Sequence, residues 1–150
     1  EASKLYYVMG TRLRTMMLCS MFADLRTGEV IALKREDVNF ERNYLHIRAT
    51  MSYGMRKKPK SRAGTRKIDM HPVLRQHLAE ILASHSNEFV FISQRGNPFS
   101  CRQNFQREYS HARENADARR LRWYGFRNLF ASIRLRVLLS APSLSRWMPR

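Results

Sequence analysis

The sequence predicts an α+β domain that is mainly helical and carries a small antiparallel sheet. Apolar residues recur at helical spacing in several segments, which is the main sequence signal of amphipathic helices. Segment 44–51 instead alternates apolar and polar residues, as half-buried strands do. A run containing glycine, proline and many basic residues follows it and leads to a second strand-like segment, which indicates a hairpin.

The N-terminal half begins with helical periodicity in residues such as Leu5, Leu13 and Met16, and Asp24 interrupts the pattern. The predicted elements are, in order, a helix over 4–22, a short helix over 28–34, a turn over 35–38, and strands over 44–51 and 65–70 joined by a basic connection over 52–64.

The C-terminal half returns to helical patterns. Pro72 suits the first turn of a helix, where a backbone donor is not needed, and an apolar stripe follows as far as Leu82. The predicted elements are this helix from 71–72, a buried strand over 89–92, a turn over 95–98, a helix capped by Ser100 and ending near Asn115, a helix over 126–139 and a short one over 144–148. Trp123, Phe130 and Trp147 are assigned to the core.

The composition favours a folded domain with a polyanionic partner. The chain has 150 residues, which suits one domain, and its 43% hydrophobic content argues against disorder. Lysine and arginine total 28 against 12 acids, giving a net charge of +16. Arginine supplies 22 of the 28, and its planar guanidinium matches phosphate in a bidentate fork. Nucleic acid is therefore the leading partner before any motif is considered.

Several other classes are disfavoured by the sequence. Cys19 and Cys101 cannot form a disulfide framework, so we expect a reducing, cytoplasmic location. The apolar run 16–23 is shorter than the roughly 20 residues that span a bilayer, so no membrane partner is expected. The histidines are scattered, so no metal site and no cofactor are predicted.

Three motifs in a fixed order carry a family resemblance. Segment 25–40 opens with Leu25-Arg26-Thr27-Gly28-Glu29, segment 59–68 surrounds Lys60, and segment 124–132 contains Tyr124-x-x-Arg127. From about residue 5 to its end the chain resembles the catalytic domain of the tyrosine recombinases, the phage integrase family. The resemblance implies that residues 1–150 are this catalytic domain without the N-terminal DNA-clamping domain and the C-terminal tyrosine segment.

The resemblance implies DNA strand breaking and rejoining through a 3′-phosphotyrosyl intermediate, without metal or ATP. Arg26 and Arg127 correspond to the two arginines that grip the non-bridging phosphate oxygens. Lys60 corresponds to the lysine that protonates the leaving oxygen. The implied biological role is DNA integration or site-specific recombination by a phage-type or mobile-element integrase.

The chain also departs from the family pattern. Tyr124 stands where the family has a histidine, and a phenol is a poor base at neutral pH. Asp24 stands where the family usually has glycine, which is expected to place a carboxylate close to Arg26. It either weakens anion binding or merely caps a helix. Pro149 and Arg150 stand at the Gly-His pair, where Arg150 is a further candidate phosphate contact. The nucleophilic tyrosine is expected about nine residues later, so no strand cleavage in cis is expected.

Further basic residues are assigned to the DNA interface. They are Arg56, Lys57, Lys58, Arg62, Arg66, Arg102, Arg107, Arg119, Arg120 and Arg122. The expected partner is double-stranded DNA at the nucleoid, bound by a chain that is a monomer in solution and a possible homo-oligomer on DNA.

Other interpretations stay open at this stage. The chain is an excerpt of an active recombinase, a DNA-binding homologue or regulator that does not cleave, or a basic RNA-associated domain. Arg26 and Glu29, taken alone, also suit a helix-surface ion pair, and the basic run 56–66 suits a solvated hairpin tip.

Overall fold

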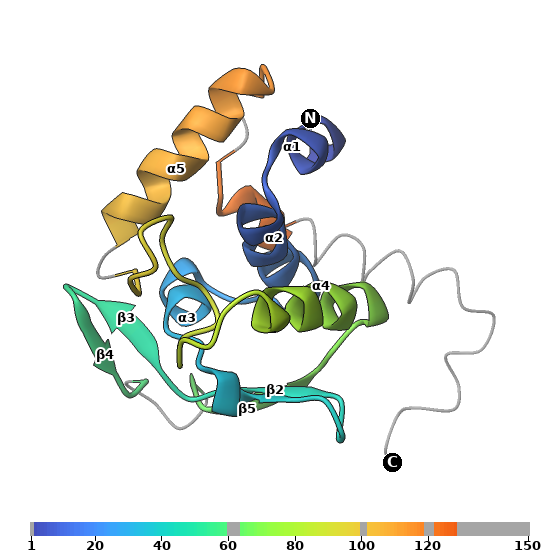
Figure 1. The fold of residues 1–150 in the computed structure, drawn as a ribbon, viewed down its shortest axis with the longest axis vertical. Helices are drawn as coiled ribbons and strands as arrows, with labels where there is room; N and C mark the ends of the chain where they lie inside the picture. Colours follow the sequence, from blue (N-terminus) through green and yellow to red (C-terminus); the bar gives the residue numbers. More distant parts are fainter. Residues whose placement is uncertain (1, 60–63, 100–101, 119–121, 129–150) are drawn as a thin grey trace, which may run out of the picture.

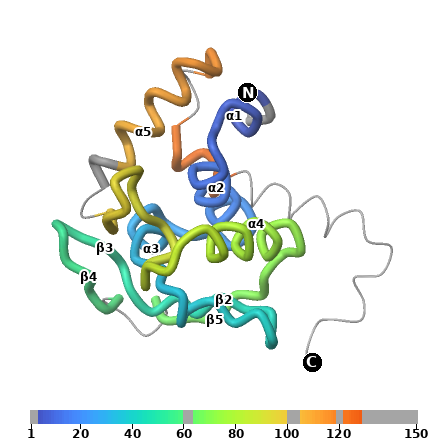
Figure 2. Tube along the Cα trace, in the orientation of Figure 1, coloured from blue at the N-terminus to red at the C-terminus, as the bar shows by residue number. Residues whose placement is uncertain are grey.

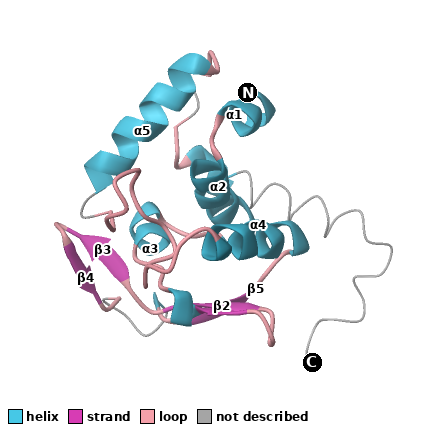
Figure 3. Ribbon diagram, viewed as in Figure 1, coloured by secondary structure: helices cyan, strands magenta, loops and turns pink. Residues whose placement is uncertain are grey.

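The computed structural model describes residues 2–59, 64–99, 102–118 and 122–128. Helices gather on one side of a small sheet formed largely by β2 (Tyr44–Ile47) and β5 (Arg66–Asp69) (Figures 1 and 3). A separate two-stranded hairpin of β3 (Thr50–Ser52) and β4 (Met55–Lys57) projects beside helix α3 (Thr27–Ile31). The predicted mainly helical α+β architecture is therefore confirmed.

The N-terminal helical pattern belongs to two helices, α1 (Ala2–Val8) and α2 (Thr11–Ala23), so the single helix expected over 4–22 was wrong. Gly10 has an extended backbone with ψ of 160° and starts α2 as its N-cap residue. The apolar spacing continues across this break, which is why periodicity alone did not find it. Most of α2 is buried, and it packs against α3 and α4 (Pro72–Ala83).

Residues 27–37 contain two short helical elements. The predicted short helix is α3 (Thr27–Ile31), and the predicted turn is a 3₁₀ helix, η1 (Arg35–Asp37). The side chain of Asp37 accepts a hydrogen bond from the Lys34 backbone N–H at 2.9 Å and fixes the start of η1.

The expected strand over 44–51 is divided between two sheets. Strands β1 (Val38–Asn39), β2 (Tyr44–Ile47) and β5 (Arg66–Asp69) form one antiparallel sheet, in which Leu45 faces Ile68. Strands β3 (Thr50–Ser52) and β4 (Met55–Lys57) form the other. Tyr53 and Gly54 make the tight turn between β3 and β4, with φ of 49° and 75°, which is the left-handed backbone of a two-residue hairpin.

The remaining elements follow the sequence pattern closely, with one exception. Helix α4 (Pro72–Ala83) starts with its proline at the first turn, and α5 (Arg102–Asn115) ends where expected. Segment 89–92 is not a strand: Phe89 and Ile92 make only isolated bridges, to Lys34 and Pro98. A helical turn covers residues 125–128, whereas Ser100 and the predicted segments 129–139 and 144–148 lie outside the described residues.

One continuous core joins α2, α4, β2 and α5, and the order of these elements can be followed along the trace in Figure 2. At the α5 end the core is aromatic, because Phe105 and Tyr109 pack in T-shaped contacts against Trp123, at 4.4 and 5.0 Å between ring centroids. Trp123 is buried as expected, while Phe130 and Trp147 lie outside the described residues. This aromatic cluster fixes the segment that follows it, 124–128.

Candidate functional site

Arg26 lies at the start of α3, where the backbone turns from extended to helical. Its backbone N–H donates to Glu29 Oε2 at 2.9 Å, so Glu29 closes the first turn of the helix and holds Arg26 at its N-cap position. The guanidinium of Arg26 is 65% exposed, and its contact with Glu29 is long, at 3.4 Å. Most of this cation therefore faces solvent.

Gly28 lets α3 approach strand β3 closely. A Cβ atom at this position would lie 2.5 Å from the Thr50 hydroxyl oxygen and 3.0 Å from the Met51 carbonyl oxygen. The Thr50 side chain would have to move and the Met51 backbone would be crowded, so the glycine of the Arg26-x-Gly28 motif has a packing role.

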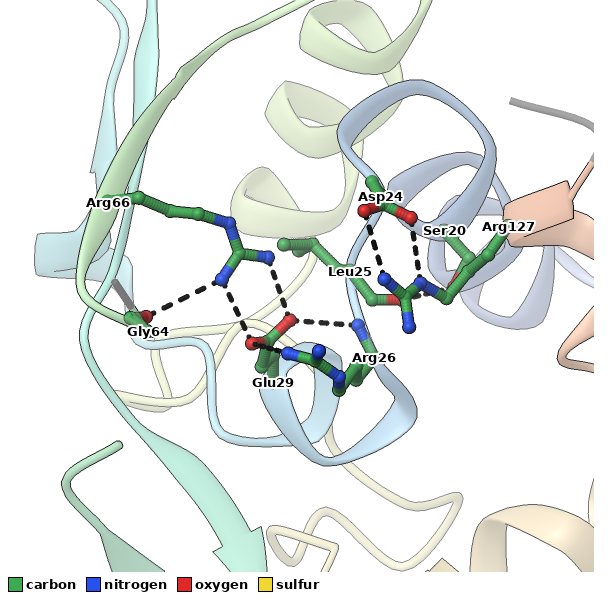
Figure 4. Close-up of polar contacts among 8 residues, drawn as sticks. All are labelled: Ser20, Asp24, Leu25, Arg26, Glu29, Gly64, Arg66 and Arg127. Atoms are coloured by element: carbon green, nitrogen blue, oxygen red, sulfur yellow. Dashed lines mark hydrogen bonds and ion pairs between the residues drawn. The ribbon is translucent and has the colours of Figure 1, made fainter. Parts of the chain in front are cut away.

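Glu29 is buried and joins α3 to strand β5. Arg66 donates two hydrogen bonds to its carboxylate, both at 3.0 Å (Figure 4). Burial raises the pKa of the Glu29 carboxyl, but the hydrogen bonds from Arg66 and from the Arg26 backbone lower it by more, so the pKa lies below its usual value. Glu29 is therefore a charged structural anchor rather than half of a surface ion pair with Arg26.

Asp24 ends α2 and faces the second arginine. Its backbone is left-handed, with φ of 52°, and its N–H donates to the Cys19 carbonyl, as in a helix C-cap. Its carboxylate accepts two hydrogen bonds from Arg127, with Nε at 2.8 Å and Nη2 at 2.9 Å (Figure 4). The two possibilities left open by the sequence for Asp24 are thus not exclusive, because its backbone caps the helix and its side chain binds an arginine.

Arg127 follows the aromatic cluster on the helical turn 125–128, and its side chain is only 14% exposed. The hydrogen bond to Asp24 raises the pKa of the guanidinium, which stays charged. The guanidinium also lies over the ring of Tyr124, 5.5 Å from its centroid.

These elements enclose a pocket of about 890 Å³. Its lining comes from α3 (Arg26, Thr27, Gly28), the β3–β4 hairpin (Thr50, Met51, Ser52, Tyr53), α5 (Gln106) and the segment after α5 (Trp123, Tyr124, Arg127). Arg26 and Arg127 are far apart in the sequence, yet both line this pocket. The exposed rings of Tyr53 and Tyr124 line it as well.

The structure brings together part of the set that the sequence selected. Arg26, Tyr124 and Arg127 line the pocket, whereas Lys60 and Arg150 lie outside the described residues. Among the residues assigned to DNA, Lys57, Lys58, Arg107 and Arg122 are exposed, Arg102 lies in α5, and Arg62, Arg119 and Arg120 lie outside the described residues.

Two of the assigned DNA contacts have internal partners. Arg66 binds Glu29, and Arg56 donates to the Ala32 carbonyl at 3.0 Å and to buried Asp37 at 3.1 Å. Asp37 also accepts a hydrogen bond from Arg48. No sequence pattern indicates these pairings, because each joins residues that are distant along the chain.

Within the described residues, no group of three histidine, cysteine or acidic side chains is placed to hold a metal ion. No helix in that same part of the chain is long and apolar enough to cross a membrane.

The fold and the motifs agree with comparisons to known proteins. The family model described as "Phage integrase family" matches residues 1–141, so the chain belongs to the phage integrase family. No curated protein matches the sequence.

Solved structures of integrases and recombinases share the fold. The XerA recombinase superposes with a TM-score of 0.74 at 20% identity, over 91% of this chain and 48% of that one. The Tn1549 transposon integrase in complex with transposon right end DNA gives 0.69 at 19% identity, over 91% and 51%. A lambda integrase dimer bound to a COC′ core site gives 0.63 at 17%, over 99% and 57%. The chain thus spans about half the length of the proteins that it matches.

Proposed function

We propose that this chain is the catalytic domain of a tyrosine recombinase, which binds duplex DNA at the pocket and takes part in DNA integration or site-specific recombination. The observation that carries the proposal is the presence of Arg26 and Arg127 in one pocket. Two permanently charged, fork-shaped donors that line one pocket from different elements suit a phosphate group.

The surroundings of the pocket support a polyanionic ligand rather than a small acid. The exposed cations Arg107 and Arg122 adjoin pocket residues in the sequence. Lys57 ends strand β4 of the hairpin that forms one wall, and Lys58 follows it. With a net charge of +16, the chain gains from phosphate neutralisation and the release of counterions.

In the proposed reaction, a tyrosine hydroxyl attacks the phosphorus, a 3′-phosphotyrosyl bond forms, and the 5′-oxygen leaves. Arg26 and Arg127 stabilise the negative charge that builds on the non-bridging oxygens. Lys60 gives the leaving oxygen its proton. Tyr124 donates a hydrogen bond to the phosphate from the position of the family's histidine.

The solved complexes of the Tn1549 integrase and of lambda integrase contain DNA, which supports duplex DNA as the partner. The proposal extends to a cytoplasmic protein at the nucleoid, monomeric in solution and assembled as a homo-oligomer on its DNA site.

The direct test is duplex affinity as a function of salt, measured by fluorescence anisotropy with a mixed-sequence duplex. We expect the logarithm of the binding constant to fall linearly with the logarithm of salt concentration, and Arg26→Ala to reduce the slope by about 1. Arg75→Ala is the matched control, because Arg75 is exposed, donates to the Phe40 carbonyl and does not line the pocket. Salt-insensitive binding, or a clear preference for single-stranded RNA, would contradict the proposal.

A second candidate, a DNA-binding regulator that does not cleave, is favoured by one observation: the pocket holds Tyr124 in place of histidine and has Arg127 neutralised by Asp24. A nicked duplex that traps phosphotyrosyl adducts separates the two functions when the family's C-terminal tyrosine segment is supplied along with the chain, because the nucleophile is expected beyond residue 150. A covalent adduct on a denaturing gel supports the recombinase, and tight binding without an adduct supports the regulator.

A further inference from the structure

The ion pair between Asp24 and Arg127 uses the part of the guanidinium that phosphate prefers. Nε and Nη2 form one donor edge, and both bind the carboxylate in a parallel, two-bond arrangement (Figure 4). A phosphate group binds arginine through the same kind of fork. Asp24 therefore holds Arg127 as a phosphate would.

Because of this contact, Arg127 is less available to a ligand than Arg26. Arg26 is mostly exposed, and its ion pair among the described residues is the long one to Glu29, whose carboxylate lies closer to Arg66. Arg127 is mostly buried and has a charged, well-aligned partner. One of the two cations is thus neutralised within the chain itself.

The side chain of Asp24 is not needed to end helix α2. The cap is made by the backbone N–H of Asp24 bonding to the Cys19 carbonyl, a bond that any residue makes in this conformation. With φ of 52°, the position suits glycine better than a residue with a Cβ atom. The carboxylate accordingly needs another explanation, and its bidentate contact with Arg127 supplies one.

We propose that the Asp24 carboxylate competes with the DNA phosphate for Arg127 and so lowers the affinity of the pocket for DNA. DNA binding then requires the carboxylate to release the guanidinium. The side chain of Asp24 is 44% exposed, which gives it a path into solvent when a phosphate arrives. This inference rests on the proposed function, because it needs a phosphate ligand at the pocket.

The experiment compares duplex affinity at low salt for the unaltered chain, Asp24→Asn and Asp24→Gly. Asn keeps the shape of the side chain and tolerates left-handed backbone, and Gly removes the side chain altogether. We expect both variants to bind about fivefold more tightly, which corresponds to the upper end for a partly exposed ion pair. Asp69→Asn is the charge-matched control, because Asp69 is exposed on β5 and does not line the pocket; we expect it to change affinity much less.

Repeating Asp24→Asn in an Arg127→Ala background tests whether Asp24 acts through the arginine. We expect the gain in affinity to shrink sharply there. An equal gain in both backgrounds would mean that Asp24 acts by its charge alone, and weaker binding by Asp24→Asn would mean that Asp24 orients Arg127 for phosphate. Either result overturns the inference while leaving the proposed function intact. Absence of salt-dependent duplex binding in every variant would instead remove the proposed function itself.

Discussion

Buried acidic side chains form ion pairs with several basic residues of this chain and make those basic residues less available to a ligand. Glu29 holds Arg66, and Asp37, which is 2% exposed, holds Arg48 and Arg56. These cations are bound within the protein, although in the sequence they look the same as exposed ones such as Lys57. The sequence predicted a basic surface but had no means of dividing it into structural and ligand-facing arginines.

The anchor role of Glu29 predicts a loss of stability on substitution. Glu29→Gln leaves Arg66 without a charged partner in a largely buried place, so we expect a loss of roughly 2–4 kcal/mol in the free energy of unfolding at pH 7. Urea denaturation followed by circular dichroism measures it. Glu36→Gln is the control, since Glu36 is 63% exposed in its pair with Arg48; its expected effect is within about 0.5 kcal/mol.

Ionised Glu29 also predicts that the free energy of unfolding depends on pH. The folded-state pKa of Glu29 lies below the ordinary 4.5, so its contribution is fully present above pH 4.5 and is lost as the pH falls through the lower folded-state pKa. Glu29→Gln should therefore flatten this part of the stability profile, measured as urea midpoints across acidic pH. An unchanged profile would show that Glu29 is not ionised in the fold.

Local sequence patterns predicted whether a segment is a helix or a strand better than they predicted which strand it pairs with. The alternation over 44–50 continues without interruption in the burial of the side chains, yet the backbone leaves one sheet after Ile47 and enters another at Thr50. Alternation reports which face of a strand is buried, not which strand it pairs with. The continuous apolar run 89–92 likewise indicates burial but not pairing: it is buried or partly buried, yet it pairs only through single bridges.

The close contact between α3 and β3 predicts that a side chain at Gly28 lowers stability and duplex binding. Gly28→Ala would force these two elements apart, because the Thr50 hydroxyl can rotate away but the Met51 carbonyl belongs to the backbone. We expect a loss of about 1–3 kcal/mol in unfolding free energy and weaker duplex binding, since both elements line the pocket.

Thermal unfolding and anisotropy on the same samples measure the two effects of Gly28→Ala. Gly10→Ala provides the comparison, because an added Cβ at Gly10 meets nothing within 4 Å. If Gly28→Ala were as stable as Gly10→Ala, the close packing of α3 against β3 would be wrong.

In the whole molecule, the fold brings Arg26 and Arg127 to one pocket, although one begins α3 and the other follows α5. The resemblance to the family predicted this pairing, whereas composition alone predicted only a basic protein. The partner of Arg127 could not be predicted, because Asp24 lies 103 residues away and its contact depends on the aromatic cluster that fixes segment 124–128.

Whether Arg26 and Arg127 bind one phosphate together is measured by a double-mutant cycle on duplex affinity. The cycle combines Arg26→Ala with Arg127→Ala in the Asp24→Asn background, so that no freed carboxylate disturbs the comparison. We predict a coupling of about 1 kcal/mol, with the double variant losing less than the sum of the single losses. Strict additivity, as expected for Arg26→Ala combined with Arg75→Ala, would mean that the two pocket arginines bind separate groups and not one phosphate.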